Sequence, residues 1–255
     1  MTAVDPISIQ LYSLRSLGDV DLVLDTVAAA GYRHVELVGA HLDDAAATRA
    51  KLAARGLQPS SSHVAMAALR ERPDGILDAC AALGCDLLFM PSVPHEERGS
   101  PAPYWRALGH ELGRLAERFA ARGVRLGYHN HAFEMQRQDD GRTALEIIFE
   151  AAGASPLLWE ADIAWLVRGG AAPKPWIERY RARLVAVHVK DIAPPGQNLD
   201  QDGWADVGTG VLDWVDLWQA CRAAGARWAV VEHDRPRDPA LTARICHDNL
   251  RRIVG

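Results

Sequence analysis

The sequence predicts an α/β fold, a closed (β/α)8 TIM barrel in one domain spanning residues 1–255. Short β-type apolar runs alternate with longer amphipathic stretches, and this pair of segments occurs eight times along the chain. Strands that alternate with helices form parallel sheets joined by right-handed crossovers. Eight such units in 255 residues fit the size of a closed barrel. The alternative is a doubly wound open sheet, but Leu11–Gly18 lacks the GxGxxG turn typical of that fold.

The expected strands are short and rich in aliphatic, aromatic or small residues. In chain order they are Ile7–Tyr12, His34–Val38, Gln58–Val64, Leu87–Met90, Arg125–His131, Leu157–Asp162, Val185–Lys190 and Trp228–Glu232.

The expected helices show apolar residues every three or four positions, most regularly in Tyr104–Arg122. The others are Asp19–Ala30, Asp43–Arg55, Ile76–Leu83, Thr143–Ala152, Trp176–Tyr180, Trp214–Ala224 and Pro239–Ile253. A glycine follows six of the helical segments, as expected for left-handed caps at helix ends. These glycines are Gly31, Gly56, Gly84, Gly123, Gly153 and Gly225.

Composition excludes several classes of function. The formal net charge of −5 provides no basic field for nucleic acid, and no apolar run approaches the length of a membrane span. The four cysteines form no CxxC motif, which favours reduced thiols. The first residues show no signal-peptide pattern, so we expect a cytoplasmic protein.

Ionisable residues gather where the predicted strands end, which is where barrel enzymes place their chemistry. They are Glu36, His63, His129, His131, Glu134, Asp162, His188, Lys190 and Glu232. Glu160 shares the face of Asp162 by strand alternation, and its role stays open. Asp191 is expected to face away from Lys190 and to hold neighbouring backbone.

A cluster of carboxylates and imidazoles is costly unless a cation neutralises it. Oxygen-rich ligands with imidazoles suit Mn²⁺, Mg²⁺, Co²⁺ or Zn²⁺, and the absence of cysteine ligands argues against a structural zinc site. We therefore expect a catalytic divalent metal. Ile192–Leu212, the longest irregular stretch, is expected to be a functional loop. Trp165 and Trp204 are expected near the rim of the barrel, where they could form the floor of a sugar-binding site.

Five motifs resemble, in chain order, those of the sugar phosphate isomerase/epimerase group of xylose isomerase-like TIM barrels. They are YHNHxFE over residues 128–134, the aspartate–aromatic pattern over 162–165, HxKD over 188–191, GxGxxDW over 208–214 and the strand-8 glutamate Glu232. The segments at 10–15 and 35–37 also fit, so the resemblance extends over the whole chain.

The resemblance implies a metal held by Asp162, His188 and Glu232. Many relatives place the fourth ligand, a glutamate, inside strand 5, where this chain has Tyr128 or His129. We expect Glu134 in that role, as in the YHNHxFE subset. The expected metal is Mn²⁺, with Mg²⁺, Co²⁺ or Zn²⁺ as alternatives.

The implied activity is isomerisation or epimerisation of a keto sugar or related polyol. A base would abstract the proton next to a carbonyl, through a metal-stabilised enediolate. The expected catalytic residues are His131, Glu232 and Glu134. The expected substrate-binding residues are Glu36, His63, His129, Lys190 and Trp165.

The main alternative is a lyase of the same family, such as an inosose dehydratase or a 3-keto-glycoside deglycosidase. A metal-dependent endonuclease and a non-catalytic sugar-binding subunit are further alternatives. The expected partner is a small sugar or polyol, with neither nucleic acid nor membrane, and family analogy allows a homodimer.

Overall fold

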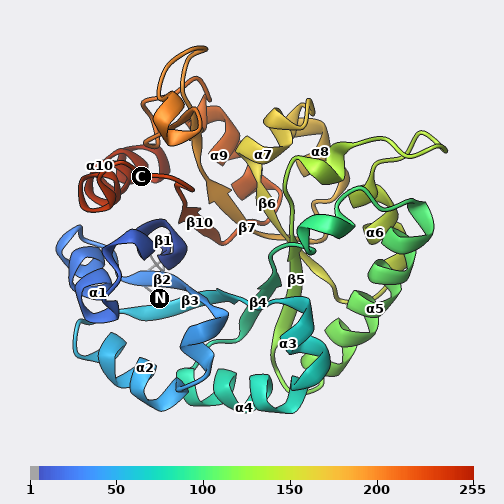
Figure 1. The fold of residues 1–255 in the computed structure, drawn as a ribbon, viewed down its shortest axis with the longest axis horizontal. Helices are drawn as coiled ribbons and strands as arrows, with labels where there is room; N and C mark the ends of the chain where they lie inside the picture. The colour runs from blue at the N-terminus through green and yellow to red at the C-terminus, as the bar shows by residue number, and fades with distance from the viewer. Residues whose placement is uncertain (1–5) are drawn as a thin grey trace.

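Eight parallel strands close into a barrel, with the helices arranged as a ring outside them (Figure 1). The computed structural model describes residues 6–255. The strands are ordered β1-β10-β7-β6-β5-β4-β3-β2 around the barrel, which confirms the predicted (β/α)8 fold. Their bounds are β1 (Ile7–Gln10), β2 (His34–Val38), β3 (Gln58–His63), β4 (Leu87–Met90), β5 (Arg125–His129), β6 (Leu158–Asp162), β7 (Leu184–Val189) and β10 (Trp228–Val231).

All eight expected helices are present, with small shifts at their ends. Their bounds are α1 (Val20–Ala29), α2 (Ala45–Ala53), α4 (Pro73–Leu83), α5 (Ala102–Ala120), α6 (Ala144–Ala152), α8 (Pro173–Arg179), α9 (Trp214–Ala223) and α10 (Pro239–Val254). The six glycines expected at helix ends all have positive φ, and Gly84 (φ 73°, ψ 30°) is a left-handed cap.

Several strand ends differ from the prediction because short helical turns begin there. β1 stops at Gln10, whose side chain accepts a hydrogen bond from the Tyr12 amide and so starts the 3-10 segment η1 (Leu11–Leu17). Two short helices were not predicted, α3 (Met66–Glu71) and α7 (Ile163–Arg168). Further 3-10 turns are η2 (Gly39–Leu42), η3 (His95–Glu97), η4 (Phe133–Met135) and η5 (Leu199–Gln201).

Side chains fill the barrel interior below the strand ends. Phe89 is fully buried beside Gly127, where an added Cβ would lie 2.6 Å from the Phe89 ring. The centroids of the Phe89 and His63 rings are 6.5 Å apart. The glycine therefore makes room for an aromatic floor beneath the polar residues at the top.

Helices α5 and α6 approach each other closely at Gly109. A Cβ there would overlap the carbonyl oxygen of Ile148 and lie 2.8 Å from the Cβ of Ala151. The close approach of these neighbouring helices depends on the missing side chain.

The loop after β7 is anchored by one carboxylate. Asp191, in the two-stranded antiparallel sheet of β8 (Asp191–Ile192) and β9 (Trp204–Ala205), accepts hydrogen bonds from four backbone amides. The Ile192 and Leu212 amides bind Oδ1 at 2.9 and 3.2 Å, and those of Gly208 and Gly210 bind Oδ2 at 3.0 and 3.1 Å. The backbone-holding role expected for Asp191 is thus present. A Cβ at Gly210 would overlap the Asp191 carboxylate, which explains that glycine.

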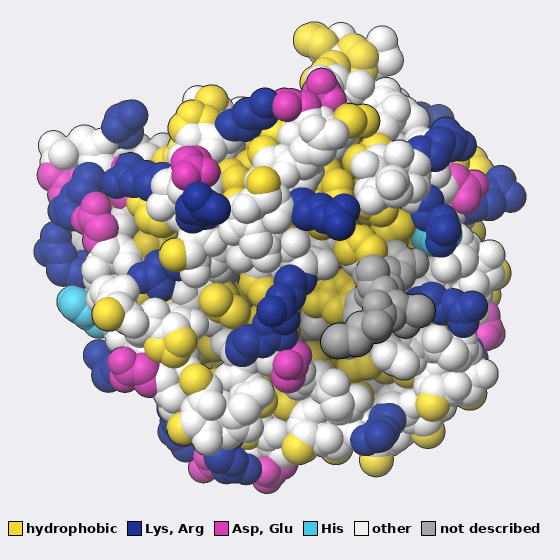
Figure 2. Space-filling model, turned by 180° about the vertical axis from the view of Figure 1, so that it is seen from behind, with side chains coloured by type: hydrophobic (Ala, Val, Ile, Leu, Met, Phe, Trp, Pro, Cys, Tyr) yellow, Lys and Arg dark blue, Asp and Glu magenta, His cyan; other side chains and the backbone are white. Residues whose placement is uncertain are grey.

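Charges of both signs are interspersed on the face opposite to the view of Figure 1 (Figure 2). Among residues 6–255, no helix combines the length and apolar character needed to cross a membrane.

Candidate active site

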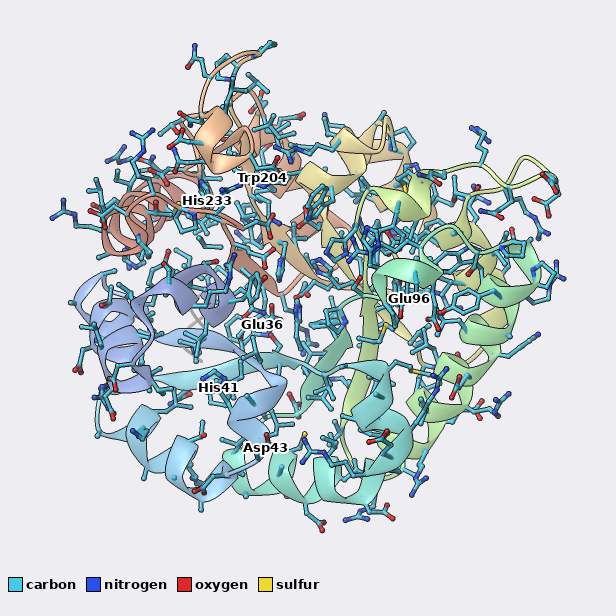
Figure 3. The ribbon with its side chains drawn as sticks, in the orientation of Figure 1. Glu36, His41, Asp43, Glu96, Trp204 and His233 are labelled. Atoms are coloured by element: carbon cyan, nitrogen blue, oxygen red, sulfur yellow. The ribbon has the colours of Figure 1, made fainter. Side chains whose placement is uncertain are left out.

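The register of three strands places a row of buried polar residues across the barrel. Gln10 pairs with Glu36, and Glu36 pairs with Ser61. Gln10 Nε2 donates to Glu36 Oε1 at 2.8 Å, and Ser61 Oγ donates to Glu36 Oε2 at 2.6 Å. Figure 3 shows Glu36 near the middle of the ring of strands. The sequence prediction placed Glu36 against substrate, but its carboxylate is fully buried and binds protein groups.

His188 links this row to the residues above it. Its Nε2 lies 2.7 Å from Glu36 Oε1 and 3.2 Å from Glu160 Oε2. Its Nδ1 lies 3.0 Å from Glu232 Oε2. The ring is fully buried, so these carboxylates fix its orientation.

Glu160 occupies a central position that the sequence prediction left open. Its Oε2 lies 2.7 Å from His63 Nε2 and 3.0 Å from His129 Nδ1. Strand alternation from Asp162 is the signal that points Glu160 inward. The expected substrate ligands His63 and His129 both contact Glu160, and His63 Nε2 also lies 3.1 Å from Glu36 Oε1.

Burial and mutual interaction shift the pKa values of these groups in opposite directions. Burial, together with the charge of Glu36, raises the pKa of Glu160 to about 8. Burial alone would raise the pKa of Glu36, but His63 and His188 hold it well below its usual range. Burial would lower the pKa of His63, but Glu36 and Glu160 outweigh it and raise the pKa to about 10.

A single ammonium group, that of Lys190, lies among three carboxylates. Lys190 Nζ lies 2.7 Å from both Glu232 Oε2 and Asp234 Oδ2, and 3.1 Å from Asp162 Oδ2. Burial would lower the pKa of Lys190, but these three carboxylates raise it above its usual value. The sequence prediction gave no role to Asp234, which ends the last strand segment, and assigned Lys190 to the substrate.

Four side chains offer donors suited to a divalent metal. One ligand atom each from His129, Asp162, His188 and Glu232 lies within 4.8 Å of the others. Asp162 Oδ2 is buried and accepts no well-directed hydrogen bond from residues 6–255. Lys190 Nζ lies 3.1 Å from it as an ion pair, and His129 Nε2 and His188 Nδ1 each lie 4.0 Å away. Two imidazole nitrogens and two carboxylate oxygens suit Mn²⁺ or Zn²⁺. The donor set therefore fits a divalent metal, and we name these four residues the donor cluster.

Glu134, the expected fourth ligand, lies outside the donor cluster. Tyr128 Oη donates to its Oε1 at 2.7 Å, and the His131 amide donates to its Oε2 at 2.8 Å. Burial raises the pKa of Glu134 to about 7. The fourth member of the donor cluster is His129, which lies beside the three other expected ligands, Asp162, His188 and Glu232.

His131 carries a buried polar atom, Nδ1, that has no hydrogen-bond partner in the described chain. Its ring packs against those of His129, Phe133 and Trp165, with centroids 4.9, 5.6 and 5.5 Å away. Burial, reinforced by the charge of Lys190, lowers the pKa of His131 to about 3. The ring is therefore neutral at physiological pH, as a proton acceptor must be.

Two tryptophans form an aromatic wall beside Lys190. The ring centroids of Trp165 and Trp204 are 4.8 Å apart at an interplanar angle of 80°. Lys190 Nζ lies 5.2 Å from the Trp165 centroid and 4.9 Å from that of Trp204. Trp204, labelled in Figure 3, belongs to the loop after β7, and its side chain is fully buried.

Comparison with known proteins identifies the family to which this barrel belongs. Residues 24–252 match the xylose isomerase-like TIM barrel family, and the chain belongs to that family.

Solved structures of sugar phosphate isomerase/epimerases share this fold. One from Parabacteroides distasonis superposes with a TM-score of 0.79 at 21% identity, over 98% of this chain and 95% of that one. A probable 3-DHS dehydratase, AsbF from Bacillus anthracis, superposes with a TM-score of 0.72 at 12% identity, over 97% and 99% of the two chains.

Sequence comparison also finds the rhizopine catabolism protein MocC of Rhizobium meliloti. It is 27% identical over an alignment of 168 residues, and the match covers 59% of this chain. The match spans 50% of the length of that curated relative.

Proposed function

We propose that this protein is a divalent-metal-dependent isomerase or epimerase of a keto sugar or related polyol. The donor cluster carries the proposal, because it joins two imidazoles and two carboxylates at the end of the barrel where enzymes of this fold work. Mn²⁺ is the proposed metal.

His129, Asp162, His188 and Glu232 would hold the metal. When bound, a divalent metal supplies Lewis-acid polarisation of a carbonyl and stabilises negative charge beside it. Glu36 and Glu160 would support these ligands without binding the metal. Glu36 would accept a hydrogen bond from Nε2 of His188, and Glu160 would accept one from Nδ1 of His129, the ring nitrogens that face away from the donor cluster. Such carboxylate–histidine pairs fix ring orientation and raise the basicity of the ligand.

His131 is the proposed proton acceptor, at Nδ1. The ring is neutral and already placed by Phe133 and Trp165, so it needs no reorganisation to accept a proton from the carbon next to the carbonyl. Lys190 holds the carboxylates of Asp162 and Glu232 in place, and Trp165 provides a flat apolar wall for a sugar ring.

Asp162→Asn tests the metal site. We expect it to lower both Mn²⁺ affinity and turnover on a keto-sugar panel by more than about 100-fold, because removing even an outer partner of a ligand costs 10–100-fold. Metal content by mass spectrometry and turnover are measured together. Asp139→Asn, an exposed change of the same kind, is the control. Full turnover by the metal-free variant would contradict the proposal.

His131→Gln tests the proton acceptor. This variant should bind Mn²⁺ as the wild type does, yet lose at least about 100-fold in the exchange of the substrate carbon-bound proton with deuterated solvent. NMR follows the exchange. The control is His110→Gln, which removes a histidine at an exposed position of α5, outside the donor cluster. Unchanged exchange in His131→Gln would assign the base elsewhere.

The same panel separates the lyase alternative from isomerisation. Isomers or epimers that carry one solvent deuteron support the proposal. Loss of water, seen as an unsaturated ketone, would assign a dehydratase instead.

A further inference from the structure

The guanidinium group of Arg98 forms no ion pair within residues 6–255 and lies one aromatic ring away from the proposed base. Arg98 directly follows η3, and Figure 3 shows its neighbour Glu96 on that turn, among the loops around the strand ends. Arg98 Nη2 donates to Ser92 Oγ at 3.3 Å. Its Nε is buried and makes no hydrogen bond within residues 6–255. A partly buried cation with unused donors is costly unless an anion joins it.

One aromatic ring connects Arg98 to His131. The guanidinium carbon lies 4.9 Å from the centroid of the Phe133 ring. That ring stacks on His131 at 5.6 Å with an interplanar angle of 18°. Arg98 and His131 therefore contact the same Phe133 ring, on the side where the β4 and β5 strands end.

The other cations around the site already have partners. Lys190 contacts three carboxylates. Arg168 pairs with Asp202 at 3.0 Å, and Arg15 donates to the carbonyl oxygens of Tyr12 and Asp234 at 2.8 and 2.6 Å. The acid closest to Arg98 in sequence, Glu97, accepts a hydrogen bond from the Tyr104 hydroxyl.

We propose that Arg98 binds an anionic group of the substrate, a phosphate or a carboxylate, at the end remote from the reacting carbonyl. Its planar fork of N–H donors matches two oxygens of either group, and the flanking Phe133 keeps the fork in place. This inference rests on the proposed function and narrows its substrate class to anionic sugars.

Direct binding to Arg98→Gln tests the inference without turnover. Isothermal titration at constant ionic strength compares fructose 6-phosphate, 2-keto-gluconate and neutral fructose on the purified protein. We expect the variant to bind the preferred anionic probe about 10–100-fold more weakly, as for losing a charged hydrogen bond, with fructose binding unchanged. Arg98→Lys, which keeps the charge and loses the fork, should fall between. Arg106→Gln, an exposed change of equal charge on α5, should bind like the wild type.

Which probe weakens in the variant distinguishes a phosphate from a carboxylate. Equal binding of every probe by the wild type and Arg98→Gln, with circular dichroism showing both folded, would overturn the inference. Equal wild-type affinity for fructose and both anionic probes would also overturn it. If Asp162→Asn kept full turnover while Arg98→Gln still lost anion binding, the reaction proposed above would fail and the anion site would stand.

Discussion

His188 is held by carboxylates at both ring nitrogens, and much of the site follows from that one residue. Glu36 and Glu160 face Nε2, while Glu232 faces Nδ1. An imidazole can present only one nitrogen to a metal, so the inner carboxylates leave Nδ1 for the donor cluster. The polar row of Gln10, Glu36 and Ser61 thereby sets the orientation of a side chain from a distant strand.

His41 makes the folding stability depend on pH. Burial lowers its pKa, only partly offset by the backbone of Val38. The unfolded chain therefore takes up more protons at this residue below about pH 6.5, and folding stability falls as the pH falls. We expect the free energy of unfolding to decrease less between pH 7.5 and 5.5 in His41→Asn than in the wild type, measured by urea titration. His110→Asn is the control, and equal slopes for wild type and His41→Asn would contradict the assignment.

Strand alternation predicts the inward direction of several site residues but not their contacts. Asp162, His188 and Glu232 fall on the inner face by their positions at strand ends. Their partners come from the register between strands: Glu36 and His188 contact each other although they lie 152 positions apart. The sequence therefore predicted a cluster of polar residues at the strand ends. It did not predict that Glu134 lies in a short turn, η4, outside the donor cluster, because three residues are too few to show a period.

The packing of helices α5 and α6 against each other depends on the absence of a side chain at Gly109. Gly109→Ala favours the isolated helix, yet its methyl group would overlap Ile148. We expect a loss of about 1–3 kcal/mol in unfolding free energy from overpacking. Gly75→Ala in α4 is the matched control, because its Cβ would meet only Arg72 at 3.9 Å. That change should add up to about 1 kcal/mol. Stabilisation by both changes would show that the helix contact has room to spare.

The two short helices α3 and α7 were not predicted, for the same physical reason. α7 has six residues and α3 also has six, too few to show a helical period. α7 begins because the Asp162 side chain accepts the Trp165 amide at 2.9 Å, so a residue of the donor cluster also caps a helix. Seven of the eight predicted helices have nine or more residues, enough to show a helical period, whereas α8 has seven.

For the whole molecule, metal binding should raise thermal stability. The folded barrel assembles the donor cluster from four different strands, or residues directly after them, which the unfolded chain cannot do. Mn²⁺ at about 100 times its dissociation constant would stabilise the fold by about 2.7 kcal/mol and raise Tm by roughly 5–10 °C. Differential scanning calorimetry with and without a chelator measures the change. Asp162→Asn should show little shift, and an equal shift in that variant would place the binding elsewhere.

The single carboxylate that accepts hydrogen bonds from four amides of the loop after β7 also limits how this protein could be re-engineered. A library that randomises residues 193–207 can vary the shape of the rim while Asp191 still closes both ends of the segment. Randomising Gly210 removes that freedom, since any side chain there meets the carboxylate itself. The shape of the rim can thus be changed by exchanging the middle of the loop, provided its two anchoring points, at 192 and at 208–212, are kept unchanged.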